Sequence, residues 1–407
     1  MRDRAIASLL KSAEPSVRWK TRVRVLGENP RSRDIRALSE KIRESPRIRA
    51  LLSLRGRFGR VGTARAVYYK WQGFHWVLAA LAELGYPPGD KSLLPIRDRV
   101  VGFWTDPRYF REFQAKTRAQ AYRPGWVPVL EGRHRRCASQ QGNALRSVLA
   151  LGIADERADA LVERLRHWQW PDGGWNCDRD PAAHTSSFHE TWLPMLGLAA
   201  YARENKNRAA ARAADRAAEV FLGRRLFKRI SDGRVMQPDI VALHYPHYWH
   251  YDILAGLMAM AELGKIRDPR CAAALDLLEE KRLPDGGWPA ERRYYKVSPK
   301  ALLANADYVN WGGTSRSKDE RVGDRRCSCG LACCWSLARL TTTSRRGREP
   351  ATRVRGWWES NPPRHKHETA TCCRASGARG VGRISEASQL RTPRPSCDSS
   401  LRGTSRW

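Results

Sequence analysis

The stretch WQWPDGGW, residues 168–175, surrounds a Pro-Asp-Gly-Gly turn with three tryptophans, and LPDGGW returns at residues 283–288. Glycine permits a sharp backbone reversal, aspartate caps it, and the tryptophan that follows offers a large apolar surface. A degenerate copy, Asp232-Gly233, lies between them, so the aspartates are 60 and 53 residues apart. A period of this length holds two helices and a loop, and it predicts an array in which each unit buries its neighbour's apolar face.

Two kinds of helix alternate along the chain. One kind is apolar over more than half of its circumference, which predicts buried inner helices; these segments are 73–85, 141–152, 188–203 and 250–264. The other kind has a narrower apolar stripe, which suits an outer layer; these segments are 154–168, 213–227 and 267–283.

The motif and the alternation together resemble a known superfamily. QWPDGGW, from Gln169 to Trp175, is similar to the QW motif of squalene and terpene cyclases. The alternation of inner and outer helices resembles the α/α toroid that these enzymes share with the β chains of protein prenyltransferases. The resemblance covers roughly residues 45–315 and implies an all-α fold. We therefore expect a helical lead-in at residues 1–45 and an α/α toroid domain at residues 46–317.

The C-terminal segment 318–407 lacks the apolar periodicity of the earlier chain, although it contains CSCGLACC at residues 327–334. A shifted reading frame explains this better than a metal site. With one choice of codons, residues 318–336 read one base later give RMNEWVTADARAVLRAAGR, an amphipathic helix. We expect 318–407 to be a frameshifted, disordered tail, which leaves the toroid incomplete at its C-terminal end.

The net charge of +32, from 74 Lys+Arg and 42 Asp+Glu, raises the question of nucleic acid. The charge is spread along the chain, interleaved with acids on the expected helices, and no recognised nucleic-acid module is present. A nucleic-acid binder is therefore the least favoured alternative, and no nucleic-acid partner is expected. No apolar run reaches about 18 residues, which predicts no transmembrane segment. The N-terminus is a poor secretory signal, so a cytoplasmic location is expected, with the oligomeric state left open.

Parallel inner helices of a toroid open their N-termini at one mouth of a central cavity, and polar residues stand at these starts. The predicted catalytic residues are His189, Glu190, His250 and Asp252, with Asp178 from the loop after the first tryptophan turn. The predicted ligand-binding residues are His75, Trp76, Arg136, Gln141, Asn143, Trp192, Tyr248 and Trp249. Each polar residue has a simpler alternative as a helix cap.

The resemblance carries over only part of the known enzyme signatures. The acidic DxDD and DCTAE signatures of class II cyclases are absent, and the nearest string is NCDRD at residues 176–180, which could also be a solvated capping loop. Prenyltransferase β chains bind zinc through an Asp-x-Cys pair and a later histidine. Alignment on Pro194 places Ala182 at the aspartate, His184 at the cysteine and His250 at the histidine. The resemblance therefore implies no firm cofactor, with a zinc ion held by His184 and His250 as an option.

We expect a protein similar to prenyltransferases and squalene cyclases that binds or transforms an apolar, isoprenoid-type ligand in the cavity. Aligned helix N-termini would also favour an isoprenoid diphosphate. Whether the protein is an enzyme, as a transferase or cyclase, stays open. The alternative is a non-catalytic toroid that holds a ligand or a protein partner.

Overall fold

The computed structural model describes residues 2–58, 67–68, 73–107, 110–122, 126–284 and 286–292. Within these ranges most residues are helical, which confirms the mostly helical prediction. Two expectations lie outside the described residues: the end of the expected toroid domain from 293 to 317, and the frameshifted tail 318–407.

The helices have the following bounds. The first are α1 (Arg2–Leu10), α2 (Pro15–Lys20), α3 (Arg33–Arg43), α4 (Pro46–Phe58), α6 (Phe74–Leu84), α7 (Leu94–Thr105) and α8 (Ala138–Ala150). The later ones are α9 (Arg157–His167), α10 (Phe188–Asn205), α11 (Arg208–Leu222), α12 (Pro238–Val241), α13 (Ile253–Glu262) and α14 (Ala272–Glu280). The short helical turns are the π-helical η1 (Thr21–Val25) and the 3-10 turns η2 (Lys91–Leu93), η4 (Gln120–Tyr122) and η5 (Pro269–Cys271).

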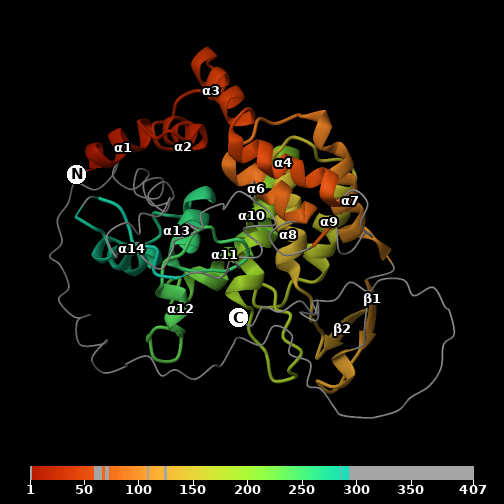
Figure 1. Ribbon diagram of the computed structural model, residues 1–407. Helices are drawn as coiled ribbons and strands as arrows, with labels where there is room; N and C mark the ends of the chain where they lie inside the picture. Colours follow the sequence, from red (N-terminus) through yellow and green to blue (C-terminus); the bar gives the residue numbers. More distant parts are fainter. Residues whose placement is uncertain are drawn as a thin grey trace, which may run out of the picture.

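The expected apolar helices pack side by side. Helix α8 lies between α6 and α10, and α13 packs against α10, so these four form a continuous inner row (Figure 1). Each has a more polar partner behind it: α7 on α6, α9 on α8, α11 on α10 and α14 on α13. Helix α9 also contacts α7 and α11, which makes an outer row. These eight helices therefore form two layers, with α9, α11 and α14 among the predicted outer helices and α7 added by the structure.

A small sheet between α7 and α8 was not predicted. Strand β1 (Arg111–Gln114) pairs in parallel with β2 (Trp126–Leu130), and β2 pairs antiparallel with β3 (Arg133–His134). Figure 1 shows this sheet at the edge of the helical body. The strands are too short for a clear period-2 pattern, and a proline interrupts the second, so the all-α expectation was wrong for this segment.

The tryptophan turn is built in the same way in both copies. The indole Nε1 of Trp175 donates to the Leu165 carbonyl oxygen at 2.9 Å, and Trp288 donates to the Leu278 carbonyl oxygen at 2.8 Å, each ten residues back. Both carbonyls belong to the last turn of an outer helix, where no intrahelical donor is available. The glycines at the reversals, Gly173 and Gly286, have φ of 101° and 85°, which favours glycine. The two copies of the motif thus share the same indole-to-carbonyl hydrogen bond.

The glutamine of the first copy links its turn to the next outer helix. The Gln169 amide donates to the Gly173 carbonyl at 2.6 Å and to the Ala213 carbonyl at 2.8 Å, and Ala213 belongs to α11. In the second copy Arg282 stands at this position and pairs with Glu279 at 2.7 Å instead. Among the described residues, the bridge between a turn and the following helix occurs in the first copy.

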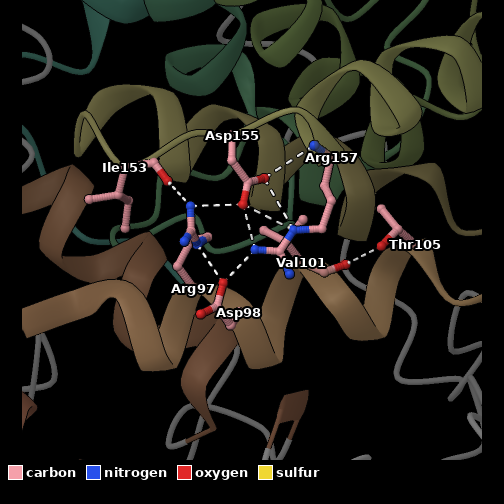
Figure 2. Close-up of polar contacts among 7 residues, drawn as sticks. All are labelled: Arg97, Asp98, Val101, Thr105, Ile153, Asp155 and Arg157. Atoms are coloured by element: carbon pink, nitrogen blue, oxygen red, sulfur yellow. Dashed lines mark hydrogen bonds and ion pairs between the residues drawn. The ribbon is translucent and has the colours of Figure 1, made fainter. Parts of the chain in front are cut away.

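Ion pairs join the outer helices α7 and α9 (Figure 2). Arg97 pairs with Asp155 at 2.8 Å and donates to the Ile153 carbonyl at 3.1 Å, while Arg157 bridges Asp98 and Asp155. Partly exposed pairs of this kind contribute little stability singly. As a network they orient the start of α9 against α7.

The inner helices α8 and α10 touch backbone to backbone. A Cβ at Gly142 would lie 2.3 Å from the Pro194 nitrogen, and one at Gly197 would lie 2.7 Å from the Gly142 carbonyl oxygen. Only glycine allows this approach, because any side chain would have to displace the facing backbone.

We predict that Gly142→Ala destabilises the protein by about 3 kcal/mol, since the clash is with backbone and overpacking costs up to about that much. Gly102→Ala is the matched control, because Gly102 is also inside a helix but its Cβ would meet only Arg157 Nη1, at 3.8 Å. Removing that glycine should stabilise α7 by roughly 0.5–1 kcal/mol. Chemical denaturation of both variants measures the two effects, and equal changes of one sign would contradict the close contact.

Candidate functional site

A partly open cavity lies among α6, α8, α10, α13 and the loop before α13. Its walls are formed by apolar side chains, among them Ala79, Leu193, Leu196 and Met258. Aromatic side chains from the N-terminal ends of the helices and from the loop close one end. Charged side chains from α6, α8 and α13 close the other end. The cavity therefore has an apolar body between two chemically different ends.

Four of the predicted ligand-binding residues line this cavity: Trp76, Asn143, Trp192 and Tyr248. The rings of Trp76 and Tyr248 meet edge to face with centroids 5.7 Å apart. Trp192 is fixed because its indole Nε1 donates to the Trp249 carbonyl at 3.0 Å. Three of these residues come from the inner helices α6, α8 and α10 and the fourth from the loop before α13, and the structure brings them together at the cavity.

The other predicted ligand-binding residues do not line the cavity. The Trp249 ring stacks on His250 with centroids 4.0 Å apart, and the Arg136 guanidinium lies 5.2 Å from the Phe110 ring centroid. Gln141 is fully buried, and its side-chain amide has no hydrogen-bond partner among the described residues. These residues pack around the cavity and do not form its surface.

His75 is buried directly behind the aromatic end. Its Nδ1 accepts from the Trp104 indole at 3.2 Å, and the Asn143 amide contacts its Nε2 at 3.3 Å. Burial lowers the pKa of His75 to about 3, so its ring is neutral at physiological pH. His75 positions the cavity residue Asn143 rather than touching the ligand space itself.

We predict that His75 makes the fold sensitive to acid. An unfolded histidine titrates near pH 6.5, so below that pH the unfolded state takes up a proton that the folded state excludes. The free energy of unfolding should therefore fall by about 2 kcal/mol between pH 7 and pH 5 on account of this residue. Urea unfolding of the wild type and His75→Gln at both pH values measures it. An identical pH dependence in the two proteins would contradict the assignment.

Asp252 is a buried carboxylate surrounded by donors. It caps α13 by accepting from Ala255 N at 2.8 Å, and its oxygens lie 2.8 Å from His244 Nδ1 and 3.1 Å from His247 Nε2. Burial alone would raise the pKa of this carboxyl, but the two histidines outweigh it and hold the pKa well below its usual range. Of the three, His247 lines the cavity. His244 and His247 were not among the predicted site residues, although the run HYPHYWHYD contains both.

The remaining predicted catalytic residues sit around the cavity and not in its lining. His189 Nδ1 accepts from Tyr251 N at 2.9 Å, and the rings of His189 and His250 are 6.1 Å apart. Glu190 accepts from Ser139 N at 3.0 Å and so joins α10 to the start of α8. Asp178 Oδ1 accepts from Asp180 N at 3.0 Å, a local loop hydrogen bond of the kind that the capping alternative implies.

The residues predicted to hold zinc lie in different surroundings. The His184 side chain is 54% exposed with Nδ1 3.5 Å from Glu131, whereas His250 is buried against Trp249. Three groups among the described residues have potential ligand atoms within 4.8 Å of one another, and neither histidine belongs to them. These groups are Glu112, His134 and His167; Cys137, Cys177 and Glu190; and His244, His247 and Asp252.

The charged end of the cavity was not predicted from the sequence, since none of its residues was among the expected site residues. Glu83 pairs with Lys20 at 2.7 Å and accepts from the Tyr245 hydroxyl at 2.9 Å. Arg146 pairs with Glu262 at 3.0 Å. Burial opposes ionisation of Glu83, but Lys20 and Arg146 lower its pKa to about 2. The sequence contained a signal for these glutamates, because the two apolar helices that carry Glu83 and Glu262 both end in Ala-Glu-Leu-Gly.

Comparison of the chain with protein-family models, with curated proteins and with solved structures found no match. Among the described residues, no helix combines the length and the apolar character needed to cross a membrane.

Proposed function

We propose that the chain is an α/α-toroid protein, similar to squalene cyclases and prenyltransferases, that binds an apolar, isoprenoid-type ligand in the cavity between α6, α8, α10 and α13. The observation that supports this is the convergence of Trp76, Asn143, Trp192 and Tyr248 on one apolar space. A concave apolar space with a few placed polar groups is the usual form of a small-molecule site.

The charges around the cavity favour an uncharged ligand over a diphosphate. Arg146 is the one cation among the described lining residues, and it already pairs with Glu262. Glu83 is likewise paired, with Lys20. Breaking a half-buried pair to receive another ion leaves a partly desolvated charge uncompensated, which is destabilising. The ligand is therefore a neutral isoprenoid or a similar apolar molecule.

His247 is the group best placed for chemistry on such a ligand. It lines the cavity, and Asp252 holds its Nε2 from behind. A histidine oriented by a buried carboxylate can donate or accept a proton. In this proposal His247 exchanges the proton and Asp252 is its positioning residue. The second candidate is a non-catalytic binding module, favoured by the fact that Asp252 also caps α13, a purely structural task.

We predict that Ala79→Phe weakens binding of a neutral isoprenoid such as farnesol at least about tenfold, because the new ring fills the cavity and the loss corresponds to about 1.4 kcal/mol. Quenching of tryptophan fluorescence follows binding, since Trp76 and Trp192 line the cavity. Ala160→Phe is the control, because Ala160 is exposed on the outer helix α9. Tighter binding of farnesyl diphosphate than of farnesol would overturn the choice of an uncharged ligand.

We predict for the catalytic form of the proposal that His247→Asn lowers turnover by about 10²–10⁴-fold, the usual worth of a general acid or base. Farnesol binding should change by less than about threefold, since His247 supplies little of the apolar surface. Product analysis after incubation with neutral isoprenoids measures turnover. Tight binding without any product from the wild type would support the non-catalytic module instead.

A further inference from the structure

We propose that Glu112, His134 and His167 form a surface site for a divalent transition metal such as Zn²⁺. The three residues come from three elements that are distant in sequence: β1, β3 and the end of α9. None of them lines the cavity, so this site is independent of the proposed ligand.

The side chains converge on one carboxylate. Glu112 Oε2 lies 3.1 Å from His134 Nε2, and Oε1 lies 2.8 Å from His167 Nε2. The two imidazole rings are close to each other, with centroids 4.6 Å apart. All three potential ligand atoms lie within 4.8 Å of one another.

These separations suit a metal with short bonds. Zinc binds histidine nitrogen and carboxylate oxygen at about 2.0–2.2 Å, so ligand atoms in a tetrahedral site lie about 3.3 Å apart. The two observed nitrogen-to-oxygen distances end on different oxygens of Glu112, and with one atom taken from each residue the candidate ligand atoms lie within 4.8 Å of one another. Binding a metal therefore requires side-chain shifts of up to about 1.5 Å. Two histidines and a glutamate leave the fourth position for water, a ligand set that zinc uses in exchangeable and catalytic sites.

The first tryptophan turn holds the ligands in place. The Trp168 indole donates to Glu112 Oε1 at 3.4 Å, and the Trp170 indole donates to the His134 carbonyl at 2.8 Å. Such supporting hydrogen bonds orient metal ligands and raise affinity. The site is also accessible, since the His167 side chain is 60% exposed and that of Glu112 is 37% exposed.

The test is metal binding by the full chain and by its variants. Zn²⁺ is titrated against a coloured chelator, and Co²⁺ absorption reports the ligand type, since thiolate ligation adds an intense near-ultraviolet band. We expect His167→Ala and Glu112→Gln each to lose one equivalent of metal, and the loss should leave any thiolate band unchanged. Glu163→Gln is the matched control for Glu112→Gln, because Glu163 is another exposed glutamate, paired with Arg166, and this variant should bind metal as the wild type does.

A second readout keeps the site separate from a general effect on folding. Metal that binds only the folded state stabilises it by about 2.7 kcal/mol when the free metal concentration is one hundred times the dissociation constant. This stabilisation raises the melting temperature. We expect Zn²⁺ to raise the melting temperature of the wild type more than that of His167→Ala. Unchanged stoichiometry and unchanged melting shift in His167→Ala would show that Glu112 merely accepts two hydrogen bonds, and would overturn the proposal.

Discussion

Helices α8 and α10 approach until their backbones touch at Gly142, Pro194 and Gly197, and the arrangement of the inner row depends on this contact. The approach brings Glu190 within reach of Ser139 N at the start of α8. It also sets Asn143 of α8 and Trp192 of α10 on the same cavity. Because backbone cannot yield as a side chain can, the contact leaves the two helices a single relative position.

The tryptophan turns fix the positions of the outer helices. Trp175 and Trp288 satisfy the final carbonyls of α9 and α14, and Gln169 ties the first turn to α11. Trp168 and Trp170, from the same turn, reach the small sheet. One motif therefore joins three neighbouring elements, which explains the use of several large aromatic residues in so short a stretch.

Charged and polar groups at its two ends distinguish the cavity from a purely apolar one. Its apolar walls alone would admit any hydrophobic molecule, but Lys20, Glu83, Arg146 and Glu262 form half-buried ion pairs at one end. At the other end the neutral His75 supports Asn143, and Asp252 holds His247. Because these charges are already paired, the proposed function assigns the cavity an uncharged ligand.

The sequence by itself determined the alternation of helices and the repeated turn, because apolar periodicity and glycine positions are local properties. It also named four residues that line the cavity, Trp76, Asn143, Trp192 and Tyr248, among the eight it proposed for ligand binding. Only the tertiary structure decided that His247 faces the cavity while His189 and His250 pack beside it, since that depends on the rotation of each element. It also decided the pairing of β1 with β2 and of Lys20 with Glu83, 63 residues apart. Contacts between distant segments follow from how the helices pack together, and no local pattern encodes that packing.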